Sequence, residues 1–210
     1  MEKYLIILFL IISFGANAKK SRGRWSFFEV GGSFSYHRQV YGEKRDSKSI
    51  SRTYSGSLAM YILRYSALEV NYSHNEDNII DSRPTVIDET NNISIIQTHQ
   101  RVYTQVYGAG LRQRLAPLSW RIAPYLSLGY AKQVEKTILS YTVDFDGTTK
   151  VLKYVSPPRQ IDSVFGTFTL AVEITQFFKL TGSVATVFKA FESNRAKDNL
   201  KYLPGLRWIF

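Results

Sequence analysis

Apolar and polar side chains alternate along most of this chain. In the segment FFEVGGSFSYHR, Phe28, Val30, Phe34 and Tyr36 alternate with small or polar residues. Successive side chains of a strand point to opposite faces, so a period of two predicts a strand with one apolar face.

The same alternation recurs in seven further segments. They read TYSGSLAMYILR, ALEVNYSH, VYTQVYGAGLRQRL, WRIAPYLSLGYA, SVFGTFTLAVEI, FFKLTGSVATVFK and, at the C-terminus, LKYLPGLRWIF. In the third of these we place Tyr103, Tyr107, Ala109 and Leu111 on the apolar face, although Val102 and Val106 on the other face weaken the pattern. The sequence therefore predicts eight strands, an even number as in single-chain bacterial barrels.

The connections between these segments alternate in length. Short turns fall at residues 65–66, at residues 116–119 and near Gln176, whereas long polar links cover residues 39–52, 75–98, 132–160 and 191–199. Short periplasmic turns and long outer loops are typical of membrane barrels. We therefore predict an all-β fold, an eight-stranded antiparallel up-and-down transmembrane β-barrel with both termini on the periplasmic side.

One long link carries its own strand signal. Within residues 132–160 the alternation continues around Asp146-Gly147, a pair favoured in tight hairpin turns. We expect a β-hairpin that projects beyond the membrane.

The N-terminal residues have the three parts of a secretory signal. Lys3 precedes an apolar run from Tyr4 to Phe14, and the small-residue sequence Ala16-Asn17-Ala18 follows. The run is too short for a comfortable transmembrane helix of about 20 residues. We expect residues 1–18 to be a cleaved signal peptide, residues 19–24 a basic leader, and residues 25–210 the barrel.

Aromatic residues gather near both ends of the predicted strands. On the apolar face, Tyr36, Tyr54, Tyr72 and Tyr130 lie toward the long links, and Trp120 and Phe178 toward the short turns. Two such rings are the interfacial girdles of a barrel that faces lipid. A soluble barrel of the lipocalin type would reverse the two faces.

Charged residues on the opposite, inward face lie toward the periplasmic ends of the strands. They are Glu29, Glu69, Arg112, Arg121, Glu173, Lys179 and Arg207. Since an unpaired charge in a low-dielectric interior is costly, we expect Glu29 to pair with Arg207, Glu69 with Arg112, and Glu173 with Arg121 or Lys179. This ionic plug would act either as packing or as a gate, and the small inward residues beyond it leave room for a cavity open to the outside.

The net charge of +10 does not indicate a nucleic-acid partner. Four of the cations fall in the leader, at Lys19, Lys20, Arg22 and Arg24, and the rest are scattered. Arg38 and Lys132 each follow an outward tyrosine by two residues. There they can meet lipopolysaccharide phosphates, although ordinary snorkelling gives the same pattern.

The sequence offers little catalytic or metal-binding chemistry. Ser35 and His37 share the inward face, but no acidic partner is evident at that height, so we predict no enzyme. His37, His74 and His99 are not expected to converge, and we predict neither a metal nor a cofactor.

The C-terminal strand carries the most specific signal. Tyr202, Leu206, Trp208 and the terminal Phe210 resemble the strand signal that the barrel assembly machinery recognises. Over its mature length the chain resembles small outer-membrane proteins of the OmpX, OmpW and opacity-protein type, with an OmpA-like barrel.

The resemblance implies a protein of the bacterial outer membrane, in contact with its lipids and lipopolysaccharide. Its implied role is non-enzymatic: support of envelope integrity, or surface interaction with an extracellular partner through residues 75–98 and 132–160. A narrow channel for small or hydrophobic solutes is the alternative, and a lipid A-modifying enzyme is the third.

Overall fold

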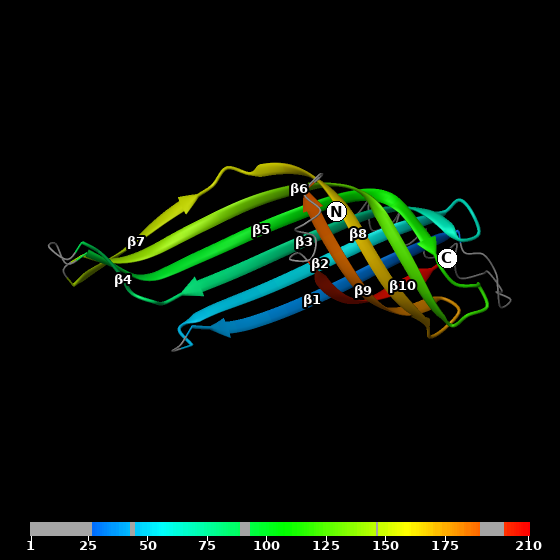
Figure 1. Ribbon diagram of the computed structural model, residues 1–210, viewed down its shortest axis with the longest axis horizontal. Coiled ribbons are helices and arrows are strands. Elements are labelled where there is room, and N and C mark those ends of the chain that lie inside the picture. Colours follow the sequence, from blue (N-terminus) through cyan, green and yellow to red (C-terminus); the bar gives the residue numbers. More distant parts are fainter. Residues whose placement is uncertain (1–26, 43–44, 89–92, 146, 190–199) are drawn as a thin grey trace, which may run out of the picture.

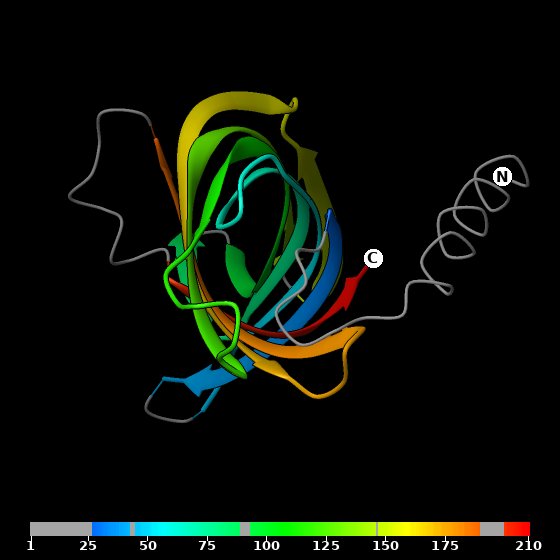
Figure 2. The ribbon, with the colours of Figure 1, turned by 90° about the vertical axis from the view of Figure 1, so that its right-hand side faces the viewer.

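Eight antiparallel strands close into a barrel in the computed structural model, which describes residues 27–42, 45–88, 93–145, 147–189 and 200–210 (Figures 1 and 2). The strands are β1 (Phe28–Tyr41), β2 (Ser47–Tyr61), β3 (Ser66–Asp81), β5 (Ile93–Arg114), β6 (Ile122–Phe145), β8 (Arg159–Glu173), β9 (Phe178–Lys189) and β10 (Lys201–Ile209). They pair in the order β5-β3-β2-β1-β10-β9-β8-β6, and the β5–β6 pairing closes the ring. The predicted barrel is confirmed, whereas the predicted signal peptide and leader lie outside the described residues.

In seven of the eight barrel strands the odd-numbered residues point toward the lumen. In β5 the even-numbered residues do so. In β1, Glu29 is buried inside, and Val30, Phe34 and Tyr36 are exposed on the outside. In β5, Tyr107 and Leu111 are exposed and Val106 is buried in the lumen, as the sequence pattern predicts. The exterior is therefore apolar and the lumen polar, the reverse of a soluble barrel. Among the described residues no helix is long and apolar enough to cross a membrane.

The outer links are shorter than predicted because the strands continue into them. β1 and β2 pair as far as Tyr41 and Ser47, and the tight turn between them has Gly42 at φ 93°. β3 runs on to Asp81, well inside the predicted link of residues 75–98. Polar residues occupy both faces here, so the alternation that marks a strand in lipid disappears although the backbone pairing continues.

The barrel wall is much taller on one side than on the other. β5 and β6 pair from Arg114 and Tyr125 up to Ile93 and Phe145. Two short strands, β4 (Thr85–Asp88) and β7 (Thr148–Val155), pair with their upper ends, and all four run far beyond β9 and β10 (Figure 1). The predicted projecting hairpin is β6–β7, with Gly147 at φ 81° in its turn; Asp146 lies outside the described residues. We call β4, β7 and the paired ends of β5 and β6 (93–101 and 138–145) the outer extension.

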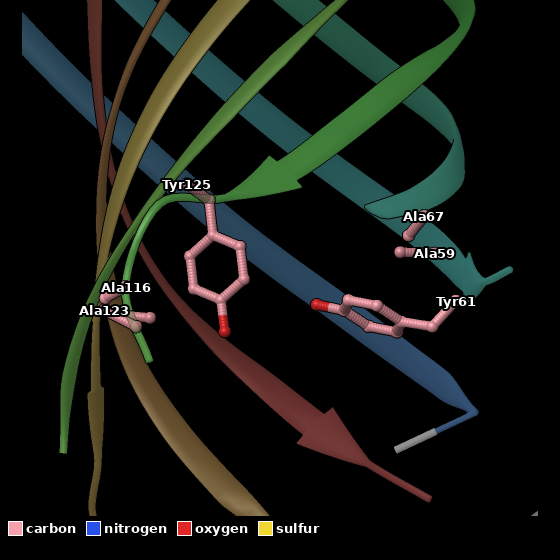
Figure 3. Packing of buried hydrophobic residues seen from close by; sticks show 7 residues of the cluster. Ala59, Tyr61, Ala67, Ala116, Ala123 and Tyr125 are labelled. Carbon is pink, nitrogen blue, oxygen red and sulfur yellow. The ribbon is translucent and has the colours of Figure 1, made fainter. Parts of the chain in front are cut away.

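One cluster of buried apolar side chains lies in the lumen at the short-turn end. Tyr61 of β2 and Tyr125 of β6 point toward one another across the lumen, as Figure 3 shows. The rest of this buried cluster consists of Ala59, Ala67, Ala116, Ala123 and Ala171. Alanines on the wall leave the space that the two rings fill.

Candidate functional site

A cluster of buried charges crosses the lumen near the short-turn end. Arg112 and Glu69 form a two-pronged ion pair, with Nε to Oε2 at 2.9 Å and Nη2 to Oε1 at 2.7 Å. The Ser127 hydroxyl also donates to Glu69 Oε2 at 2.6 Å. Such geometry satisfies a buried carboxylate far better than a single contact does.

Glu29 is shared by three cations. Lys179 Nζ donates to its Oε1, Arg112 Nη1 lies 3.5 Å from its Oε2, and Arg207 Nη1 lies 3.9 Å from the same oxygen. The Tyr125 ring packs beneath two of them, with Lys179 Nζ and Arg207 Cζ each 5.4 Å from its centroid. Its hydroxyl accepts a hydrogen bond from Lys179 at 2.9 Å.

We define the luminal cluster as Glu29, Glu69, Arg112, Lys179 and Arg207. Its three cations face two carboxylates, so it carries one excess positive charge. Arg207 is the least satisfied member: Nη2 donates to Thr169 Oγ1 at 3.3 Å, but Nη1 has no hydrogen-bond partner among the described residues.

Two of the expected ion pairs lie together and the third does not. Glu69 contacts Arg112, and Glu29 contacts Arg207, although Lys179 is the closer partner of Glu29. The placement of Arg121 in the lumen is wrong. β6 begins only at Ile122, so strand alternation does not apply to Arg121, and its side chain is exposed.

Arg114 occupies the place that Arg121 was expected to take. Its Nη1 lies 3.9 Å from Glu173 Oε1, and its guanidinium donates to the carbonyls of Ala116, Pro117 and Trp120 at 3.1 to 3.2 Å. Arg114 thus stabilises the turn between β5 and β6. The sequence signal was available, since Arg114 shares the inward parity of Arg112 two residues earlier.

A cavity of about 350 Å³ lies above the luminal cluster. Glu69 and Arg207 are the members of the cluster that line it, so the cluster forms its floor. Its walls are mainly small polar side chains from β1, β2, β3, β8 and β9, among them Ser33, Ser55, Asn71, Ser73, Thr167 and Ser183. A cavity is therefore present where the small inward residues predicted one, and its opening to the outside stays a prediction.

The aromatic residues predicted as girdles all lie on the outer surface. Tyr36, Tyr54, Tyr72, Tyr130 and Trp120 are exposed there, and Phe178 packs on Trp208 with ring centroids 4.4 Å apart. Their role at the two lipid interfaces stays a prediction.

Arg38 and Lys132 are exposed on the outer surface, each beyond a tyrosine of the same strand. The structure adds two residues that the sequence analysis missed: Arg52 and Arg101 stand in the same relation to Tyr54 and Tyr103. The spacing is again two residues. Because β2 and β5 are antiparallel to β1 and β6, the cation precedes the tyrosine in the sequence.

Ser35 and the three histidines do not form a catalytic or metal-binding group. Neither Ser35 nor His37 makes a side-chain hydrogen bond within the described part of the chain. His74 stacks on Tyr103, and His99 contacts Asn78. The described residues contain no group of three His, Cys, Asp or Glu side chains that could hold a metal ion.

The last strand closes the ring against the first. Phe210 N–H donates to the Phe28 carbonyl at 3.0 Å, and its ring stacks on Trp208 at 6.1 Å. Tyr202 and Leu206 point outward from β10 and are exposed. The four residues therefore form one outward stripe; their recognition during assembly stays a prediction.

Comparison with known proteins gives likeness in structure alone. No protein-family model and no curated protein matches the chain. The N-terminal β-barrel domain of Pseudomonas aeruginosa OprF is 12% identical, with a TM-score of 0.49 over 89% of this chain and 100% of that one. Ail, the attachment invasion locus protein of Yersinia pestis, is 11% identical, with a TM-score of 0.47 over 89% and 100%. Neisserial surface protein A is 12% identical, with a TM-score of 0.45 over 88% and 98%.

The class of the protein follows from its own sheet. A sheet can cross lipid only if no strand edge is left unpaired, and this ring of eight strands is closed. Because it also turns its apolar side chains outward and its charges inward, the chain has the architecture of a small eight-stranded transmembrane β-barrel.

Proposed function

We propose that this protein is a non-enzymatic surface barrel that acts through its outer extension, either in contacts with an extracellular partner or in support of the envelope. The observation that carries the proposal is β7. Every residue of this strand is exposed, and among the described residues β7 pairs only with β6. An unpaired strand edge is a template for another extended segment.

The composition of β7 suits a binding surface. Val151, Leu152 and Tyr154 are 66%, 52% and 59% exposed, and together they place apolar side chains on both faces of the strand. Lys150 and Lys153 add positive charge. An extended segment with acidic and apolar residues would complement this edge. β7 falls within residues 132–160, and β4 within residues 75–98, the two links from which a partner contact was expected.

The outer surface around the base of the extension suits lipopolysaccharide. Arg38, Arg52, Arg101 and Lys132 each lie two residues beyond an outward tyrosine, where a cation meets phosphate at the membrane surface. We include contact with lipopolysaccharide in the proposal, together with recognition of Tyr202, Leu206, Trp208 and Phe210 by the barrel assembly machinery.

The two other candidate functions have less support. A channel for small solutes would need a path through the luminal cluster, which forms the floor of the cavity. A lipid A-modifying enzyme would need an activated nucleophile, and within the described chain Ser35 and His37 make no side-chain hydrogen bond to one another or to a carboxylate.

The test is to shorten the β6–β7 hairpin. Leu139 and Tyr154 are direct partners across the two strands, so a two-residue Asn-Gly turn can join them in place of residues 140–153. We expect the shortened protein to fold, as judged by heat-dependent gel mobility. Cells that express it should lose attachment to protein-coated surfaces if the extension binds a partner, or lose detergent resistance if it supports the envelope.

A matched control shortens the opposite hairpin. Arg38 and Ile50 are direct partners in β1 and β2, and the same Asn-Gly turn can join them in place of residues 39–49. This variant should keep both attachment and detergent resistance. If the β6–β7 variant folds and changes neither property, or if both variants change them equally, the extension is not the functional element.

A further inference from the structure

The cavity above the luminal cluster has two kinds of wall. On β2 and β3 the polar side chains bond to one another: Thr53 Oγ1 donates to Asn75 Oδ1 at 2.7 Å, and Ser55 donates to Ser73 at 3.2 Å. These groups are already satisfied by the protein and have less to offer a ligand.

Four other polar side chains that line the cavity have no hydrogen-bond partner among the described residues. Asn71 of β3, Thr104 of β5, Gln133 of β6 and Thr167 of β8 line the same space, and none makes a side-chain hydrogen bond within the described residues. Polar groups in such a position are satisfied by water or by a bound molecule. Four strands thus supply two amides and two hydroxyls that are free to bind.

An apolar patch completes this wall. Phe165 lines the cavity and packs with Val106, Ala131 and Val187. A Cβ on Gly129 would come within 2.5 Å of Phe165 Cε1, so the glycine leaves the room in which the ring lies. The aromatic ring is therefore held in place beside the free amides and hydroxyls.

We propose that this cavity binds a small, neutral, polyhydroxylated solute of the monosaccharide class, which enters from the outside. Amide and hydroxyl side chains both donate and accept hydrogen bonds, as sugar hydroxyls do. The carbon face of a sugar packs against an apolar patch. A volume of about 350 Å³ lies at the lower end of the range for small-molecule sites.

The charged side chains that line the cavity are of both signs, which favours a neutral ligand over a charged one. They are Glu69, Asp77, Glu135, Lys201 and Arg207. Glu69 is held by both prongs of Arg112 and by Ser127, so it has no need of a cationic ligand. Nη1 of Arg207 is buried and lies on the side of Glu29. Because the cluster closes the lower end, the solute is retained in the cavity and does not pass through the barrel.

The test uses the chain from residue 19, refolded in detergent micelles, and three sugars: D-glucose, D-galactose and N-acetyl-D-glucosamine. The side-chain amide signals of Asn71 and Gln133 are followed by NMR during each titration. We expect at least one sugar to bind saturably, with a Kd on the order of 1 mM, typical of a ligand held by a few hydrogen bonds. Gln133→Met keeps the shape of the side chain but removes its amide. It should weaken binding about two- to tenfold, the loss of one or two hydrogen bonds.

Gln105→Met is the matched control, because Gln105 lies on the outer face of β5 and accepts a bond from the Tyr107 hydroxyl. It should leave the affinity unchanged. If Gln133→Met does not fold, Thr167→Val supplies a smaller change with the same expected direction. The proposal is overturned if no sugar gives a saturable shift, if the control weakens binding as much as the cavity variant, or if D-gluconate binds more tightly than D-glucose.

Discussion

At the scale of single residues, Glu29 holds the lower lumen together. Its carboxylate is the shared partner of Lys179, Arg112 and Arg207, and both it and Arg112 are only 1% exposed. Water cannot replace the carboxylate at such depth, so its loss would leave like charges buried beside one another.

Glu29→Gln should therefore destabilise the barrel strongly. We expect a loss of about 3 to 5 kcal/mol in the free energy of unfolding, measured by urea titration in micelles, as for other broken buried pairs. Glu173→Gln is the control, because Glu173 is 33% exposed and lies 3.9 Å from Arg114. Its effect should stay below about 1 kcal/mol. Equal effects of the two variants would contradict the central role of Glu29.

A second ion pair, at the end of β3 farthest from the short turns, sets a pH dependence. Arg83 Nε and Nη2 donate to the two carboxyl oxygens of Asp81 at 2.9 and 2.5 Å, and these bonds hold the Asp81 pKa well below its usual range. The folded pKa is depressed, so the pair stabilises the protein above the unfolded pKa of about 3.9. This contribution is lost as the pH falls through the folded pKa.

Carboxyl NMR titration tests the pair directly. Asp81 should remain ionised at pH values where an ordinary aspartate is protonated, and Arg83→Gln should raise its pKa toward the usual range. Arg64→Gln, in the β2–β3 turn at the other end of the barrel, should have no effect. An unchanged Asp81 titration in Arg83→Gln would show that another group depresses the pKa.

Residue parity predicts which side chains enter the lumen but not all their partners. Glu69 and Arg112 were predictable because β3 and β5 are neighbours and both residues lie near the short turns. Lys179 reaches Glu29 across β10, which stands between β9 and β1. Such contacts depend on the curvature of the barrel and on the length of the side chains. They cannot be predicted from the order of the strands alone. The prediction that Arg121 lies in the lumen was wrong for a different reason. Arg121 lies outside the strand, where side chains do not alternate between two faces.

At the scale of elements, β5 and β6 approach unusually closely at two inward glycines. A Cβ on Gly129 would lie 2.3 Å from the Ala109 carbonyl oxygen and 2.5 Å from Gly110 Cα. These contacts are to backbone, which cannot move aside as a flexible side chain does. The tallest pair of strands is thus joined where glycine is required.

Gly129→Ala should separate this pair. We expect a destabilisation of about 1 to 3 kcal/mol in urea unfolding, as for other overpacked sites. Gly182→Ala in β9 is the control, because a Cβ there meets no atom within 4 Å. Its effect should lie within about 0.5 kcal/mol of zero. A neutral Gly129→Ala would mean that the strands can part without cost.

The sequence predicted the strands in lipid better than those outside it. Alternation is imposed by the membrane, so β1 and β8 were recognisable from Phe28, Phe34, Phe168 and Leu170. The upper parts of β2 and β3 have polar side chains on both faces, and only pairing with neighbours makes them strands. The hairpin at Gly147 was recognisable because its turn residues carry a local signal.

At the scale of the whole molecule, the luminal cluster fills the lumen near the short-turn end of the barrel. The refolded protein should show no discrete conductance in a planar bilayer, with folding checked by heat-dependent gel mobility. The physical reason is that ions would have to part Glu29 and Glu69 from the cations that hold them. Replacing Glu29 and Glu69 together by alanine should raise conductance if the cluster is the barrier. Reproducible openings of the unchanged protein would favour the channel function instead.

The seam where the chain's two ends meet is the weakest joint in the ring. Among the described residues, β1 and β10 pair only from Glu29 and Ile209 to Ser33 and Gly205, whereas β5 and β6 pair along nearly their whole length. Any sideways opening toward lipid would therefore begin here, on the side of the ring opposite the tall wall. Separation of β1 from β10 would expose Glu29 and Arg207, which lie on these two strands, to the hydrocarbon of the membrane. Because that exposure is costly, the charges that fill the lumen also hold the two strands together.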